Sequence, residues 1–393
     1  MEIIKRIILT VLVIVLIRFG NFIPVANVNQ SALLPFLKSS SSLNSFLTRD
    51  DFILSIFSLG IIPNINASIL IQLLISINPR LERLQKEEGE LGRTQIKKYI
   101  RVLTLVLAIF ESLSIVFFLK PLVVDWSVIN CLEILVSLTT GSMVMLWLSE
   151  VITENGIGNG SSIIITLGIL NSISKSGLKS IQTANLQALL FIFITFTFLI
   201  IGIIYVQEAI RVVPFITAKQ LFINRSYERK NSETSYIPLK INQGGVMPLI
   251  FSSTFLTFLT VGINFLLKGN SNFNLIQKSS LFSLSLNLVN FILIVIFSLF
   301  YSNLVLNPKE ISKDLKKMAI TVPGVRPGEQ TTLFFKQVLT RLSLLGALFL
   351  GFLVALPNIR NLTGFGITSL LILVGVSVDI TRQIQTLIIS QKY

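Results

Sequence analysis

Long apolar runs recur along almost the whole chain and are separated by short polar segments. A helix needs about 20 apolar residues to cross a bilayer core of about 30 Å, and ten of the runs are close to this length. The ten predicted spans cover residues 7–22, 52–77, 102–119, 134–149, 156–174, 186–207, 246–267, 281–306, 342–357 and 366–389. The pattern therefore predicts an all-α membrane protein with ten transmembrane helices.

The first of these runs has the outline of a signal peptide, because Lys5 and Arg6 precede its apolar stretch. No small-residue cleavage site follows, however, and Arg18 interrupts the run. We therefore expect this segment to remain in the protein as its first span.

The composition excludes an ordinary soluble domain and most enzyme chemistries. Hydrophobic residues make up 52% of the 393 positions and charged residues 13%, whereas soluble domains carry about a quarter charged residues. With no histidine and one cysteine, Cys131, the chain has no basis for a histidine metal site or a disulfide framework. The sequence also lacks a Gly-x-x-x-x-Gly-Lys-Ser/Thr phosphate loop and paired catalytic carboxylates. We therefore expect no enzyme activity, no cofactor and no metal, with energy supplied by a partner.

Positive charge is concentrated on one side of the predicted membrane. Lys and Arg residues stay on the side from which a membrane protein is inserted. With the N-terminus on the inner side, the inner segments hold 24 Lys and Arg residues and the outer loops hold 8. Both termini are therefore predicted to face the cytosol or its equivalent.

Three inner segments, residues 80–101, 208–245 and 307–341, are long and basic. One such segment can serve only to fix the orientation of the protein in the membrane. Three on the same side favour a docking surface for RNA phosphates or for an acidic protein, because neutralising either partner requires Lys and Arg. The charge pattern leaves the choice between these partners open.

Two short motifs repeat in the two halves of the chain. Residues 60–68 (GIIPNINAS) and 245–253 (GVMPLIFSS) share glycine, proline, isoleucine and serine at the same four positions. The offset separates two halves of five spans each, and an odd number of spans gives the halves opposite orientations, which defines an inverted repeat. Because proline is tolerated in the first turn of a helix, both motifs predict helix starts. Ser68 and Ser253 would then let the two helices pack closely or separate.

Polar side chains within the predicted spans include Arg18, Gln72 and Glu111. Burial of an ionisable group in a membrane is costly, so such residues are candidates for a function. A structural role in helix packing is the alternative for each of them.

Longer motifs closely resemble the SecY family, the central subunit of the protein-conducting translocase. They are GIIPNINASILIQLL (60–74), WLSEVITENGIGNGSSIII (147–165), NPKE (307–310) and VPGVRPGEQT (322–331). The resemblance runs from the first span to the last and includes IPLKIN (237–242) and QIQTL (383–387).

The resemblance implies a clamshell of two inverted, pseudo-symmetric five-helix halves with an hourglass pore between them. The halves would be residues 1–174 and 186–393, hinged by residues 175–185, and a plug helix would lie around residues 43–52. A lateral gate would open between spans 2 and 7. The residues expected at this gate are Ser68, Gln72, Glu111 and Ser253.

By the same resemblance, a ring of apolar side chains seals the pore. Its members would be Ile61, Ile65, Ser161, Ile165, Ile250 and Ile372. Such a ring excludes water and ions when no polypeptide occupies it. Ser161 departs from the aliphatic residue that is usual in the family, which predicts a slightly wetter constriction.

The implied function is a channel that moves unfolded preproteins across the membrane and releases hydrophobic segments into the lipid. The inner loops would bind the motor ATPase SecA or the ribosome. The residues expected to dock these partners are Arg211, Lys313, Lys316, Lys317 and Arg326. A SecE-type subunit would brace the two halves, and a SecG-type subunit is a further candidate partner.

A secondary transporter of a small solute is the alternative function, because inverted repeats and interrupted spans are also typical of such carriers. A carrier should concentrate polar groups at the midplane, whereas the aligned centre of this chain is rich in isoleucine. The abundance of Ile, Leu, Ser, Asn, Lys and Phe is typical of AT-rich genomes. It favours a plastid thylakoid membrane, with both termini on the stromal side, over the plasma membrane of an AT-rich bacterium.

Overall fold

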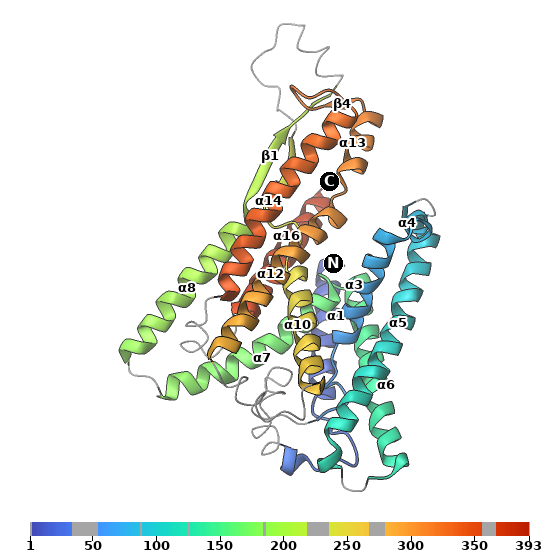
Figure 1. The fold of residues 1–393 in the computed structure, drawn as a ribbon, viewed down its shortest axis with the longest axis vertical. Coiled ribbons are helices and arrows are strands. Elements are labelled where there is room, and N and C mark those ends of the chain that lie inside the picture. The colour runs from blue at the N-terminus through green and yellow to red at the C-terminus, as the bar shows by residue number, and fades with distance from the viewer. Residues whose placement is uncertain are drawn as a thin grey trace. The chain divides into compact units, whose positions relative to one another are not determined.

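Each of the ten predicted spans coincides with a helix in the computed structural model (Figure 1). The structure describes residues 2–33, 54–86, 89–123, 126–183, 186–217, 236–266, 280–355 and 367–392. The helices are α1 (Glu2–Gly20), α3 (Ile62–Ile77), α5 (Gly89–Phe118), α6 (Val128–Asn155), α7 (Gly160–Thr183), α8 (Leu186–Glu208), α10 (Met247–Leu266), α12 (Ser280–Val305), α14 (Glu329–Ala355) and α16 (Ile367–Lys392). The predicted ten-helix architecture is therefore confirmed.

Within the described residues, five helices are long and apolar enough to cross a membrane. Four of them cover Gly89–Phe118, Val128–Asn155, Glu329–Ala355 and Ser369–Ser390. The fifth stretch, Ser285–Lys317, contains most of α12 and the short helix that follows it. Several helices extend well past the predicted apolar runs. For example, α5 and α14 each begin 13 residues before the predicted start of their span, because polar residues continue a helix outside the bilayer.

The chain divides into two compact units. Unit 1 comprises Met1–Ser174 together with Val376–Tyr393, and unit 2 comprises Lys175–Gly375. Helix α7 runs on to Thr183, so most of the expected hinge segment, residues 175–185, is helical. The expected plug, residues 43–52, lies outside the described residues.

In unit 1, helices α3, α5 and α6 pack side by side, and α1 packs on α6. The short helix α4 (Pro79–Lys86) folds back onto α5, and Ile71, Ile75 and Ile96 form a small core at this end. A larger core joins the segment between α1 and α3 to α5 and α6. Its fully buried members include Leu33, Ala108 and Leu138.

In unit 2, α12 packs against α14 and α10. Phe297 of α12 makes edge-to-face contacts with Phe251 and Phe255 of α10, at centroid distances of 4.5 and 6.0 Å. Such contacts add to the apolar burial that holds the two helices together.

Two short antiparallel ribbons, which the sequence analysis did not predict, shape the inner side of unit 2. Strand β1 (Ile210–Pro214) pairs with β3 (Tyr236–Lys240), and β2 (Ile216–Thr217) pairs with β4 (Ile320–Thr321). Both are rich in β-branched residues, which suit an extended backbone. The second ribbon pairs a strand that follows β1 with a strand that precedes α14, so the described parts of these two basic segments are joined.

Candidate functional site

The two repeated motifs adopt the same local structure at the starts of α3 and α10. Gly60 and Gly245 have φ angles of +61° and +58°, a left-handed conformation that glycine adopts without steric cost. A proline then occupies the second position of each helix, where its missing N–H is not needed. The hydroxyls of Ser68 and Ser253 donate to the carbonyl oxygens three residues earlier, each at 2.8 Å. The repeat seen in the sequence is therefore also a repeat in backbone geometry.

An isoleucine lies two residues after the proline in both helices. Ile61, directly before α3, and Ile65, in its first turn, are 3% and 5% exposed, so the start of this helix packs its apolar face inward within unit 1. On α10, Ile250 is half-buried within unit 2. Ile165 of α7 and Ile372 of α16 are also half-buried.

Ser161 has a local hydrogen-bond partner at the start of α7. Its hydroxyl donates to the side-chain oxygen of Asn159 at 2.7 Å, and its backbone N–H donates to the same oxygen at 3.1 Å. Asn159 thereby accepts from the first turn of the helix, as N-terminal capping side chains do. The polar group at this position is thus engaged in starting the helix.

Polar side chains link α3 to α5 inside unit 1. Asn66 donates to the Glu111 carboxylate at 3.2 Å, and the Thr104 hydroxyl lies 3.4 Å from the Asn64 side-chain oxygen. Thr104 is fully buried, while Asn66 and Glu111 are half-buried. Glu111 therefore has a defined partner, which the sequence analysis did not identify. Gln72, one and a half turns further along α3, is half-buried.

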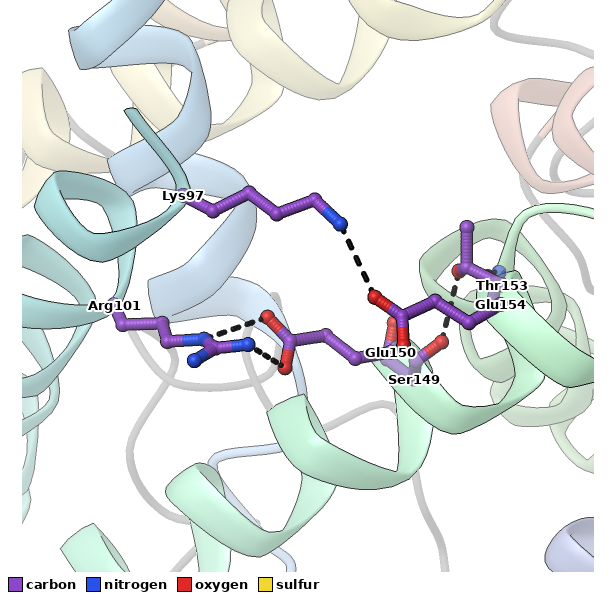
Figure 2. A network of polar contacts seen from close by, with 7 residues as sticks. Lys97, Arg101, Ser149, Glu150, Thr153 and Glu154 are labelled. Carbon is purple, nitrogen blue, oxygen red and sulfur yellow. Dashed lines mark hydrogen bonds and ion pairs between the residues drawn. The ribbon is translucent and has the colours of Figure 1, made fainter. Parts of the chain in front are cut away.

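Two ion pairs join the inner ends of α5 and α6 (Figure 2). The Arg101 guanidinium makes a bidentate contact with Glu150, at 2.9 Å from Nε to Oε1 and 2.8 Å from Nη2 to Oε2. Lys97 Nζ lies 3.1 Å from Glu154 Oε1. The cations and the carboxylates are each four residues apart, so each pair occupies one face of its helix.

The same network continues into the junction between α6 and α7. The Thr153 hydroxyl donates to the Ser149 carbonyl at 2.8 Å and accepts from the Gly160 N–H at 2.9 Å. A β-carbon added at Gly160 would lie 1.9 Å from the Ser149 carbonyl oxygen. The backbone of α7 therefore starts in direct contact with α6, and only glycine fits there.

Reversing the charge of Arg101 should destabilise unit 1 through this ion pair. We expect Arg101→Glu to lower the free energy of unfolding by about 1 kcal/mol, because an exposed bidentate pair contributes at most about that amount. The double variant Arg101→Glu/Glu150→Arg should recover most of the loss. Thermal unfolding followed by the fluorescence of Trp126 and Trp147 measures both.

Lys98 gives the matched control for this experiment, since it is exposed and adjacent to Lys97 on the same helix. Lys98→Glu should change the unfolding temperature much less than Arg101→Glu. Equal effects of the two substitutions, or no recovery in the double variant, would contradict the assigned pairing.

The expected docking residues lie on an inner surface of unit 2 that has its own apolar core. Fully buried Phe335 and Leu339 of α14 pack with Val213 of β1 and with Leu315 of α13 (Pro308–Lys317). Figure 1 shows β1 running alongside α14, with α13 and β4 near the inner end of the same helix. The loops are thus held by packing, which presents their charged side chains in a defined arrangement.

Arg326 occupies an exposed tip whose backbone is fixed by hydrogen bonds. The Thr331 hydroxyl donates to the Arg326 carbonyl, and the Ser312 hydroxyl donates to the Gly328 carbonyl, both at 2.8 Å. Gly324 and Gly328 have φ angles of +79° and +112°, which favour glycine. The Arg326 side chain is exposed and available to a partner.

The other expected docking residues are exposed as well. Lys316 and Lys317 lie three and four residues after Lys313 on α13, so all three are exposed on its outer face, while Ser312 and Leu315 are buried beneath it. Lys317 also lies 3.8 Å from Asp314. Arg211 is exposed on β1. The β2–β4 ribbon joins the segment that carries Arg211 to the segment that carries the other cations.

The SecY family model matches residues 55–381 of the chain. Two similar curated proteins, both named protein translocase subunit SecY, come from Guillardia theta and Synechococcus elongatus. The first is 42% identical over 408 residues, covering 99% of this chain and 95% of the relative. The second is 38% identical over 414 residues, covering 99% of this chain and 93% of the relative.

Solved structures match the same length of chain. One, described as the structure of a protein conducting channel, superposes with a TM-score of 0.67 at 16% identity and covers 98% of this chain and 92% of that one. Another, Sec61 in the canine ribosome-channel complex from the endoplasmic reticulum, superposes with a TM-score of 0.64 at 16% identity and with the same coverage. At this identity the superpositions establish the fold alone.

Proposed function

The chain belongs to the SecY family and is a multi-pass, protein-conducting channel subunit rather than an enzyme, and on that premise we propose that its pore is lined by the starts of α3 and α10. The observation that supports this proposal is the matching geometry of the two repeated motifs. Each has a left-handed glycine, an early proline and an isoleucine in the first helical turns. Inverted repeats of transport proteins place their functional centre at such interrupted helices.

The seal of the pore is proposed to be a ring of apolar side chains from both halves. Its members are Ile61, Ile65, Ser161, Ile165, Ile250 and Ile372. Branched apolar side chains can close around a passing polypeptide and dewet the pore when it is empty. Because the Ser161 hydroxyl donates to Asn159, its polarity is partly satisfied by a neighbouring side chain.

A lateral gate between α3 and α10 would release hydrophobic segments into the lipid. Ser68 and Ser253 are small, and each hydroxyl donates to a carbonyl oxygen of its own helix, so these positions would let the two helices pack closely or separate. Gln72 and Glu111 are the polar groups assigned to the same gate, with Asn66 as the partner that keeps Glu111 in place on α5. Movement at the gate would use the segment 175–185 as a hinge between the halves, with a plug formed by residues 43–52.

The secondary-transporter alternative does not account for the family match. A carrier would need charged or polar ligands for its solute at the repeat interface. The corresponding first turns of α3 and α10 instead carry isoleucines in both halves.

The inner surface of unit 2 is proposed to dock the motor or ribosome that drives translocation. Arg211, Lys313, Lys316, Lys317 and Arg326 would supply the charge. The solved Sec61 structure named above is a ribosome-channel complex, which supports the ribosome as one partner, and SecA is the second candidate. Signal-bearing preproteins would be the substrates, and SecE-type and SecG-type subunits would brace the channel within the lipid.

The proposed location is the plastid thylakoid membrane, with both termini in the stroma. Support comes from the similar SecY proteins of Guillardia theta and of the cyanobacterium Synechococcus elongatus. The excess of Lys and Arg in the inner segments sets the orientation. The plasma membrane of a bacterium is the alternative.

Joining the two gate helices should block lateral release. The test uses the double variant Ser68→Cys/Ser253→Cys in a Cys131→Ala background, with the two cysteines linked by a short bifunctional maleimide. We expect the link to lower the rate of membrane insertion of a signal-anchor protein by about tenfold or more, because the gate helices can no longer separate. Insertion into proteoliposomes, assayed by carbonate extraction, gives the rate. A long, flexible linker should restore it.

Each single-cysteine variant treated with the same reagent is the control, and both should insert normally. If the short linker forms the cross-link and insertion continues at the uncrosslinked rate, α3 and α10 do not form the gate.

A further inference from the structure

Three amide side chains of unit 2 lie on segments that meet near the start of α10: Asn242 is buried, and Gln207 and Gln243 are half-buried. Gln207 is the next-to-last residue of α8, and Asn242 and Gln243 precede α10. The Ile241 N–H donates to the Ala209 carbonyl at 3.1 Å, which continues the β1–β3 pairing. This contact brings the end of α8 next to the segment that leads into α10.

The hydrogen bonds of these three amides are incomplete within the part of the chain that the structure describes. Asn242 is 7% exposed and donates to the Gly245 carbonyl at 3.0 Å, but its side-chain oxygen has no partner there. Gln243 accepts from the Ser302 hydroxyl at 3.0 Å, while its Nε2 has no partner among the same residues. The Gln207 Oε1 is likewise buried and unmatched in the described structure. Such groups are normally satisfied by protein or by ordered water.

Glycines let the neighbouring backbones approach this group closely. A β-carbon at Gly346 of α14 would lie 2.9 Å from the Ile241 carbonyl oxygen. One at Gly375 of α16 would lie 3.0 Å from Gln207 Nε2 and 2.7 Å from Val246 Cγ2. The Gln207 side chain and Val246 therefore both lie against the backbone of α16 at Gly375, and the Ile241 backbone lies against α14 at Gly346.

The three unmatched atoms have the composition of a water site. Asn242 Oδ1 and Gln207 Oε1 are acceptors, and Gln243 Nε2 is a donor. A water molecule offers two donors and two acceptors and commonly makes about three hydrogen bonds when it is buried. We propose that Asn242, Gln243 and Gln207 bind internal water at the start of α10 and that this hydrated cluster is the pivot on which α10 moves.

The functional part of this inference rests on the proposed role of α10 as a gate helix. Water exchanges hydrogen-bond partners with little cost, so it lets a helix start shift relative to α8 and α12 without leaving an amide unsatisfied. An apolar cluster of the same volume would instead hold α10 in one packed position.

The first test is direct observation of the water. A cryo-EM map of the complete translocase, at a resolution that shows ordered solvent, should contain density within about 3.5 Å of at least two of the three unmatched atoms. A protein group that fills the site, or a site without solvent density, would overturn the proposal.

The second test measures gating. We expect Gln207→Leu to slow translocation of a preprotein into proteoliposomes by about fivefold or more. Leucine removes the amide that binds the proposed water and replaces it with apolar packing. Gln207→Ser keeps a hydroxyl and leaves room for water, and it should restore the rate to within about twofold of the unmodified protein.

Asn290→Leu is the matched control, because Asn290 of α12 also has a buried, unmatched side-chain oxygen but lies well before Ser302 on that helix. It should translocate normally. Equal slowing by Asn290→Leu, or no slowing by Gln207→Leu, would overturn the pivot. Photocrosslinks from positions 65 and 250 to a stalled preprotein, measured in the same variants, report separately on the pore, so loss of the pivot alone leaves them in place.

Discussion

Arg326→Glu is expected to abolish protein translocation while the protein still assembles in the membrane. The side chain is exposed, and the tip that carries it is held by Ser312 and Thr331 through backbone carbonyls. Folding therefore does not depend on the guanidinium. Reversing its charge replaces attraction to an acidic partner with repulsion, and losing one close interfacial charge pair costs about 2–5 kcal/mol, so translocation should fall by about 30-fold or more.

The assay is ATP-dependent or ribosome-coupled import into proteoliposomes, with membrane levels of the variant measured in parallel. Arg326→Lys should retain part of the activity, because lysine keeps the charge but loses the planar fork of donors. Lys336→Glu makes the same charge change at an exposed position of α14 and should reduce translocation far less. Normal translocation by Arg326→Glu would refute the docking role.

Gly160→Ala is expected to prevent stable folding of unit 1. The added β-carbon would lie 1.9 Å from the Ser149 carbonyl oxygen and 2.7 Å from its carbon, and both atoms belong to the backbone of α6. The start of α7 must then move, which breaks the contact between the Gly160 N–H and Thr153. Overpacking of this kind costs about 3 kcal/mol or more when no flexible side chain can yield.

Gly168→Ala provides the control in the same helix, because a β-carbon there meets nothing within 4 Å. This variant should be as stable as the unmodified chain or slightly more so, since alanine favours a helix over glycine. Size-exclusion profiles and thermal unfolding in detergent distinguish the two. A folded Gly160→Ala variant with an unchanged unfolding temperature would show that the close contact between α6 and α7 is not a constraint.

The helices could be predicted from the sequence because each one depends on its own residues. Apolar runs of membrane-spanning length mark all ten. The bounds differ most at α5 and α14, which have polar extensions, and at α3, which begins at Ile62 rather than at residue 52. The helix starts at the two repeated motifs could also be predicted, because the conformations of Gly60 and Gly245 and the positions of the early prolines depend on local backbone sterics.

Features that depend on two distant segments could not be predicted in the same way. The two strands of the β2–β4 ribbon have two residues each, which is too short to show an alternation of polar and apolar residues. They also lie about 100 residues apart in the sequence. Asn66 was not singled out beside Glu111 because only the packing of α3 on α5 brings the two together. One signal was available in the sequence. Lys97 and Arg101 on α5 are opposite in charge to Glu150 and Glu154 on α6, and both pairs have a spacing of four residues.

The central claim is that the two repeated motifs line a polypeptide pore. A photocrosslinking amino acid placed at Ile65, and separately at Ile250, tests it with a signal-bearing preprotein stalled during translocation. The control position is Phe198 of α8, which is 77% exposed. Crosslinks from positions 65 and 250 to the mature part of the preprotein, with none from 198, are the predicted result, whereas their absence despite successful targeting would contradict the pore assignment.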